Sequence, residues 1–246
     1  MAWLRSHWRW CALNSFAAFI STYVLSQGST GWDNPDVLDP QLESGKWAIR
    51  FLLTSLLMTP LNTYFGWRSA ITLRKSAGLW SFGFAASHIL FYVRETKWEW
   101  LTLAMPLYLK LGLVGIMILG VLAVTSNRWS MQQLGKNWKR LHRLVYVSGI
   151  AVVTHAMLAT TMSKKLMVRD PQAESELKVY LAVLSVLLVV RIPLIRQWLK
   201  QAPIILKRAR KSTRPVGESN RPTLLPEIHG RESGASVKPT FILLKA

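Results

Sequence analysis

Three histidines, His88, His142 and His155, lie in or at the edge of apolar stretches of this 246-residue chain. An imidazole inside a membrane helix is costly without a polar partner, so such a residue marks a candidate functional site. Neutral imidazole is also a common axial ligand of haem iron. Two of these side chains on different helices could therefore hold one haem between them.

Each histidine also has a purely structural explanation. His88 and His155 could be bonded to a backbone carbonyl or to a nearby hydroxyl group, without any cofactor. His142 stands beside Arg143 and close to Arg140, so it could equally be a solvated side chain that contacts lipid headgroups. The sequence leaves both explanations open for His142.

Composition places these histidines in a membrane protein. The chain has a formal net charge of +19, yet half of its residues are hydrophobic and its mean hydropathy is positive. Charged and apolar residues must therefore be segregated, as in a chain whose apolar runs approach the ~20 helical residues that cross a bilayer. We expect basic loops between spans and no nucleic-acid binding. Cys11 is the only cysteine, which excludes an internal disulfide and a cysteine-ligated iron–sulfur cluster.

We predict an all-α membrane protein in which six transmembrane helices form a bundle. The six apolar runs have the approximate bounds 10–25, 47–65, 78–93, 107–125, 144–161 and 179–199. The predicted domains are a cytoplasmic N-terminus at 1–9, a six-helix haem-binding transmembrane domain at 10–200, and a basic, disordered cytoplasmic tail at 201–246. We find no internal repeat in this sequence.

Loop charges predict the orientation of the bundle. The acidic residues before position 212 all follow the first, third or fifth run, whereas basic residues follow the second, fourth and sixth. By the positive-inside rule both termini are expected in the cytoplasm. The basic run at 207–211 is expected to lie on anionic membrane lipid.

The same orientation predicts the depths of the histidines. His88 and His155 each lie 13 residues after the cytoplasmic start of their span, near Lys75 and His142 respectively. At ~1.5 Å per residue both would lie ~20 Å from that boundary, and they could clamp one haem. His142 would be ~20 Å from His155 along the helix and ~140° around it, so His142 serves a second centre or none. Arg191, in the sixth run, is expected either to reach the cytoplasmic edge or to pair with a haem propionate.

An ordered set of short motifs across five of the six runs resembles the MsrQ family, also called YedZ. The resemblance covers about residues 10–200. Its motifs are Gly45-Lys46-Trp47-Ala48, Thr59-Pro60-Leu61, Arg74-Lys75 with Gly78-Leu79, His88, Thr125-Ser126, Leu134-Gly135, Trp138, Leu141-His142-Arg143-Leu144, Tyr146 and His155.

The resemblance implies a six-helix cytochrome of the bacterial inner membrane with b-type haem and associated flavin mononucleotide (FMN). Family members take electrons from the quinol pool or a cytoplasmic flavin reductase. They deliver them to MsrP, a periplasmic molybdopterin enzyme that reduces methionine sulfoxide in oxidised proteins. The family's histidines correspond to His88, His142 and His155, and no residue of this subunit acts on methionine sulfoxide. The chain departs from the family pattern at Arg74-Lys75-Ser76-Ala77 and in its longer tail.

Two alternatives remain. Another ferric-reductase-like membrane cytochrome would usually carry its own flavin–nicotinamide module, for which the tail is too short. In a haem-free membrane anchor or transporter, the histidines would be incidental and would bind no cofactor. A transporter normally places acidic groups at the middle of its spans, and none of the six predicted runs contains one.

Overall fold

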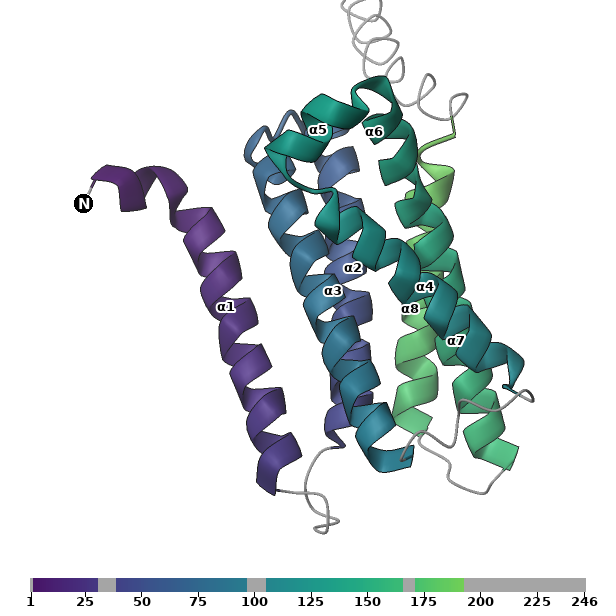
Figure 1. Cartoon of the computed structure of the whole chain (residues 1–246). Coiled ribbons are helices and arrows are strands. Elements are labelled where there is room, and N and C mark those ends of the chain that lie inside the picture. Colours follow the sequence, from purple (N-terminus) through teal and green to yellow (C-terminus); the bar gives the residue numbers. More distant parts are fainter. Residues whose placement is uncertain (1, 31–38, 97–104, 166–170, 193–246) are drawn as a thin grey trace, which may run out of the picture. The chain divides into compact units, whose positions relative to one another are not determined.

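A computed structural model describes residues 2–30, 39–96, 105–165 and 171–192, and within these ranges the regular structure is entirely helical (Figure 1). The prediction of an all-α protein is confirmed. The helices are α1 (Ala2–Thr30), α2 (Pro40–Phe65), α3 (Ser69–Thr96), α4 (Leu107–Val124), α5 (Arg128–Leu134), α6 (Lys136–Leu141), the 3-10 turn η1 (His142–Leu144), α7 (Val145–Lys165) and α8 (Pro171–Val189).

Each predicted run overlaps one long helix, but several predicted boundaries are wrong. The helix of the sixth run begins at Pro171 and ends at Val189, so Arg191 follows α8 and does not lie inside it. Hydropathy misses the first turns of α8 because they are charged, with Lys178 bonded to Glu174 at 3.1 Å one turn apart. The predicted N-terminal segment at 1–9 is already part of α1 from Ala2 onward. Residues 193–199 and the predicted tail at 201–246 lie outside the described residues.

Helices α2 and α3 form a closely packed antiparallel pair. Asp39 caps α2 by accepting hydrogen bonds from the backbone N–H groups of Gln41 and Leu42, and α2 ends at Gly66, whose φ of 67° suits glycine. Small side chains let the two helices approach. Thus the Ser81 hydroxyl on α3 donates to the Ala48 carbonyl on α2 at 2.9 Å.

Helices α4 and α7 form a second antiparallel pair, in which the buried Ser148 hydroxyl donates to the Gly115 carbonyl at 3.1 Å. α8 packs against α7 and α2, and α1 lies alongside α3 (Figure 1). A core of buried aliphatic residues, including Leu52, Leu56 and Val153, joins α2 to α4, α7 and α8. The short helices α5 and α6 lie at the end of the helices where α4 stops and α7 starts (Figure 1).

Large apolar side chains cover much of the outer surface, as expected for helices that face lipid. Phe19, Leu90 and Met117 are 70%, 69% and 63% exposed. By length and composition, two helical stretches within the described ranges could cross a membrane: Leu107–Val124 and Lys136–Met162. Each of the other long helices has at least two serines and at least two charged residues, which lower its hydropathy.

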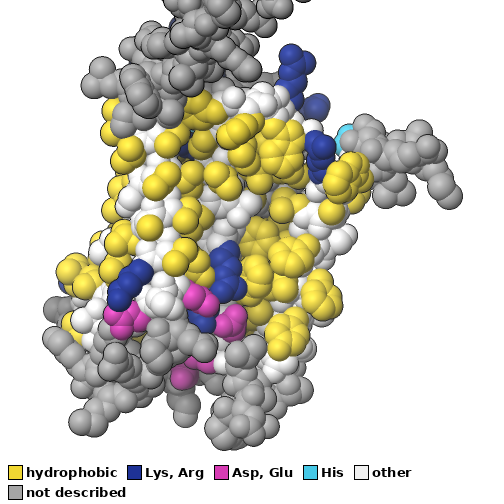
Figure 2. All heavy atoms as spheres, turned by 180° about the vertical axis from the view of Figure 1, so that it is seen from behind, with side chains coloured by type: hydrophobic (Ala, Val, Ile, Leu, Met, Phe, Trp, Pro, Cys, Tyr) yellow, Lys and Arg dark blue, Asp and Glu magenta, His cyan; other side chains and the backbone are white. Residues whose placement is uncertain are grey.

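The described acidic residues gather at one end of the helices (Figure 2). They are Asp39, Glu43, Glu95, Glu174 and Glu176, which start α2, end α3 or start α8. The remaining acids of the predicted acidic side, Asp33, Asp36, Glu99 and Asp170, lie outside the described residues. The same end also carries basic residues that pair with these acids, because Lys46 bonds Glu43 at 3.1 Å and Arg50 bonds Glu176 at 3.2 Å.

Candidate cofactor site

The side chains of His88 on α3 and His155 on α7 lie next to each other. Their ring centroids are 6.3 Å apart, and their ring planes make an angle of 78°. Both rings line a cavity of about 450 Å³ between α2, α3, α4, α7 and α8. That volume is within the range of small-molecule and cofactor sites.

Backbone carbonyls of neighbouring helices orient both rings. The Nδ1–H of His88 donates to the Gln41 carbonyl at 2.8 Å, and the Nδ1–H of His155 donates to the Tyr108 carbonyl at 2.7 Å. A carbonyl only accepts, so these bonds fix the tautomer and leave each Nε2 with a free lone pair. Metal-bound histidines are usually oriented by such a bond from the other ring nitrogen. The chemistry of this donor pair suits a metal held between two imidazoles.

Each imidazole packs against a glycine on the neighbouring helix. A Cβ atom at Gly112 on α4 would lie 2.9 Å from Nδ1 of His155, and one at Gly45 on α2 would lie 3.0 Å from Nδ1 of His88. The first distance is too short for real atoms and the second is at the limit. These two glycines therefore provide the space that the rings occupy.

The two helix pairs repeat the same contacts in the same register. The histidine bonds to Gln41 and Tyr108 each span 47 residues, and the bonds of Ser81 and Ser148 to the opposite helix each span 33 residues. The expectation of no internal repeat was wrong at the level of structure. The sequence signal is faint, since it consists of a serine seven positions before each histidine and a glycine at the matching place on the preceding helix.

The spacing of the rings fits a haem iron between them. An imidazole nitrogen binds a metal at about 2 Å, and the ring centre lies about 1 Å further away, so two imidazoles on opposite sides of one metal have centres about 6 Å apart. The observed 6.3 Å agrees with this arrangement. The cavity lining is mainly apolar, with Tyr92 and Tyr108 among its polar members. Two imidazoles at this spacing beside a mainly apolar cavity are chemically suited to hold a haem.

Sequence analysis missed a polar network on one side of this cavity. Glu176 and Tyr180 on α8 line it, and both bond Arg50 on α2. The Tyr180 hydroxyl also donates to Glu176 at 3.1 Å, and the Arg50 guanidinium lies 4.7 Å from the Trp47 ring centroid. The network ties α8 to α2 beside the histidines. Its only sequence signal was an arginine inside an apolar run.

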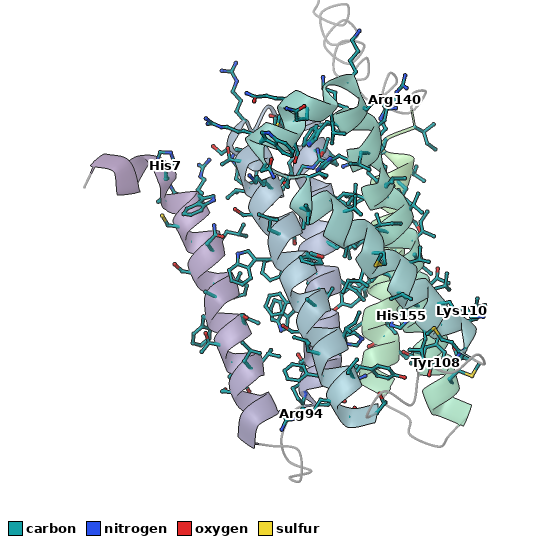
Figure 3. All side chains as sticks on the ribbon, viewed as in Figure 1. His7, Arg94, Tyr108, Lys110, Arg140 and His155 are labelled. Atoms are coloured by element: carbon teal, nitrogen blue, oxygen red, sulfur yellow. The ribbon has the colours of Figure 1, made fainter. Side chains whose placement is uncertain are left out.

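His142 does not line this cavity. It lies in η1, where its ring stacks on Trp138 with centroids 4.0 Å apart and its Nδ1–H donates to the Trp138 carbonyl at 3.2 Å. Figure 3 shows His155 and Tyr108 together near the end that carries Arg94, and Arg140 at the opposite end. The structure thus brings two of the three predicted site histidines together and keeps the third apart.

Comparison with known families first defines the class of protein. Residues 44–164, which include both cavity histidines and His142, match the family model for the ferric reductase like transmembrane component. Over these residues the chain is similar to a transmembrane class of protein, and their described part is helical with a histidine pair inside the helices. No solved structure gives a significant match.

Curated relatives then identify the particular family. The chain is 30% identical over 198 residues to the protein-methionine-sulfoxide reductase heme-binding subunit MsrQ of Yersinia enterocolitica, covering 78% of this chain and 94% of the relative. It is 34% identical to the MsrQ subunit of Rhodospirillum rubrum (62% of this chain, 72% of the relative). For the subunit of Agrobacterium fabrum the identity is 39% (56% and 65%). The chain belongs to the MsrQ family, which confirms the predicted resemblance.

Proposed function

We propose that this protein is a haem-binding electron-transfer subunit of a methionine-sulfoxide reductase system, with a b-type haem held by His88 and His155. One observation carries the proposal: two imidazoles, each with Nδ1–H bonded to a carbonyl, line one cavity at a spacing of 6.3 Å. The names of the relatives, heme-binding subunits MsrQ, support the same cofactor and system.

The chain's own residues hold and insulate the redox centre. When bound, the haem supplies a reversible one-electron couple at iron. His88 and His155 would hold the haem iron, and two protein ligands to the iron favour electron relay over binding of oxygen or substrate. Gln41 and Tyr108 fix the rings through their carbonyls. The mainly apolar lining lowers the polarity around the site, and the Arg50–Glu176 pair places its charges on one side of the cavity.

We place the haem site near the periplasmic side of a bacterial inner membrane. In this proposal α1, α2, α3, α4, α7 and α8 are six spans, both termini are cytoplasmic, and the acidic end of the helices faces the periplasm. The acids at the starts of α2 and α8 and at the end of α3 support this orientation.

Reporter fusions test this orientation. Fusions after Gln27, Thr96 and Lys165 should report a periplasmic location, because those positions belong to the acidic end. Fusions after Trp67, Asn127 and Lys207 should report the cytoplasm. Paired alkaline-phosphatase and green-fluorescent-protein activities measure each position. A cytoplasmic signal after Lys165 contradicts the six-span arrangement.

The proposed partners follow the family. Electrons enter from the quinol pool or a cytoplasmic flavin reductase and leave to an MsrP-like periplasmic molybdoenzyme that repairs oxidised proteins. FMN is proposed as a second cofactor, and His142 as a ligand or contact at the cytoplasmic end. The basic run at 207–211 is proposed to lie on anionic lipid headgroups.

A purified preparation tests the function directly. We expect a red protein whose reduced spectrum has the Soret and alpha bands of a six-coordinate b-type cytochrome. After stoichiometric reduction, adding an MsrP-like enzyme with methionine sulfoxide should reoxidise the haem. Without methionine sulfoxide, the enzyme should reoxidise only as much haem as matches the electrons that the enzyme itself can accept. A colourless preparation contradicts the haem proposal and supports a haem-free anchor. If the haem stays reduced after the enzyme and methionine sulfoxide are added, the proposed electron acceptor is wrong.

A further inference from the structure

A half-buried arginine is held at the end of the helices opposite the acidic residues. Arg191 follows α8, and its Nη2 donates to the Leu56 carbonyl on α2 at 2.7 Å. That carbonyl lacks a helical donor because Pro60, four residues later, has no N–H. The Tyr64 hydroxyl donates to the Val190 carbonyl at 2.9 Å, so the same stretch is tied to α2 twice. The position of the guanidinium is therefore fixed by the fold.

The bond to the Leu56 carbonyl uses only one of the N–H donors of the Arg191 guanidinium. Nε and Nη1 of Arg191 are buried and have no hydrogen-bond partner among the described residues. The guanidinium lies 4.4 Å from the centroid of the Tyr146 ring, which supports its charge from one side only. Arginine stays charged at any physiological pH, and a buried charge without a counterion is strongly unfavourable. A neutral donor would satisfy the carbonyl at lower cost.

Two residues close in sequence to those that contact Arg191 also have buried polar atoms without hydrogen-bond partners. Within the ranges that the structure describes, the buried side-chain nitrogen and oxygen atoms without a hydrogen bond are Nε and Nη1 of Arg191, Oγ1 of Thr59 and Nε2 of His142. Thr59 adjoins Pro60, and His142 lies one turn before Tyr146. Leu56 and Tyr146 contact Arg191, so Thr59 and His142 each lie within one helical turn of a residue that contacts it. The cluster is distinct from the cavity of His88 and His155, which none of its three residues lines.

A second arginine adds to the uncompensated charge. Arg74 on α3 lies beside the same part of α2, because the Ser55 hydroxyl donates to the Arg74 carbonyl at 3.0 Å and the next residue, Leu56, accepts the bond from Arg191. No described acidic residue pairs with Arg74 or Arg191, because Asp39, Glu43, Glu95, Glu174 and Glu176 lie at the other end of the helices. Two guanidinium groups without a described carboxylate indicate a site for an anion.

We propose that Arg74 and Arg191 bind the phosphate group of a phosphate ester, with Thr59 and His142 as additional hydrogen-bonding partners. Guanidinium groups bind phosphate oxygens through paired N–H donors. A phosphate monoester carries about −1.5 to −2 charges at neutral pH, which balances two arginines, whereas a single carboxylate leaves one arginine uncompensated. The phosphate can come from FMN or from a membrane lipid with a terminal phosphate, such as phosphatidic acid. This site goes beyond the haem function and does not depend on it.

Binding of FMN and riboflavin to the purified full-length protein tests the flavin source, since riboflavin lacks the phosphate. Quenching of flavin fluorescence measures both affinities. Wild type should bind FMN at least about tenfold more tightly than riboflavin, and this preference should disappear in Arg74→Gln and Arg191→Gln. Arg191→Lys keeps the positive charge and should retain part of the preference for FMN. Arg68→Gln, at an exposed arginine before α3, is the matched control and should behave as wild type.

Native mass spectrometry after exchange into phosphatidic acid or diacylglycerol tests the lipid source. Retention of phosphatidic acid by wild type and Arg68→Gln, with loss in Arg74→Gln and Arg191→Gln, assigns the site to lipid phosphate and supports the proposal. The haem spectrum and thermal unfolding are recorded on the same preparations, and both should be unchanged in Arg74→Gln. If neither FMN nor phosphatidic acid binding differs between Arg74→Gln and Arg68→Gln, the proposal is wrong and the arginines are structural. Loss of haem from Arg74→Gln or Arg191→Gln with unchanged phosphate binding also overturns the proposal, since the arginines would then bind a carboxylate group of the haem.

Discussion

Replacing either His88 or His155 with alanine should abolish the six-coordinate haem spectrum of the purified protein. Each substitution removes one of the two imidazoles that line the cavity, together with its bond to the carbonyl of Gln41 or Tyr108. Loss of an outer-shell partner alone typically costs 10–100-fold in metal affinity, and loss of a ligand should cost at least as much. We expect haem content to fall about tenfold or more, with any remaining haem five-coordinate. Absorbance and electron paramagnetic resonance spectra measure both effects.

His142→Ala is the comparison for this experiment. His142 lies outside the cavity with its ring on Trp138, so its removal should spare the haem between His88 and His155. Reduction by a cytoplasmic or quinol donor should become slower if His142 takes part in electron entry. Retention of the full low-spin spectrum in both His88→Ala and His155→Ala would exclude the pair as ligands. Loss of all haem from a folded His142→Ala protein would place His142 in the main site.

Adding a single methyl group at Gly112 should disturb the same site without touching a histidine. The new Cβ would lie 2.9 Å from Nδ1 and 3.0 Å from Cε1 of His155, a ring held by its bond to the Tyr108 carbonyl. The ring must move and that bond must weaken. We expect Gly112→Ala to lower haem affinity about tenfold, as expected for loss of an outer-shell partner. Haem titration of the apoprotein gives the affinity.

Two further glycine variants make this test specific. Gly45→Ala should have a smaller effect of the same kind, because its Cβ would lie 3.0 Å from Nδ1 of His88. Gly83→Ala on α3 is the matched control, since nothing lies within 4 Å of its Cβ. There alanine should raise helix stability by roughly 0.5–1 kcal/mol and leave haem affinity unchanged. Equal haem affinities in Gly112→Ala and Gly83→Ala would show that His155 does not need its present position.

The helices and the pairing of two histidines could be predicted because both depend on periodic local signals. Apolar runs located each long helix, and the equal distance of His88 and His155 from the starts of their runs placed them at one depth. The polar start of α8 could not be predicted from hydropathy, because ion pairs such as Lys178–Glu174 stabilise helix outside any apolar run. Contacts such as that of Arg191 with Leu56 join residues 135 positions apart, and no local pattern records them.

The repeated register of the two helix pairs has a consequence for the origin of this fold. Each pair, α2 with α3 and α4 with α7, supplies one imidazole, one carbonyl that orients it and one glycine that makes room for it. A single pair is half a site, and it becomes complete only beside a second copy. Two identical hairpins related by a two-fold axis along their helices would bind one metal on that axis. Duplication and fusion of an ancestral hairpin dimer would give this arrangement. The two copies could then diverge, so that one has His142 at the position equivalent to Lys75 in the other.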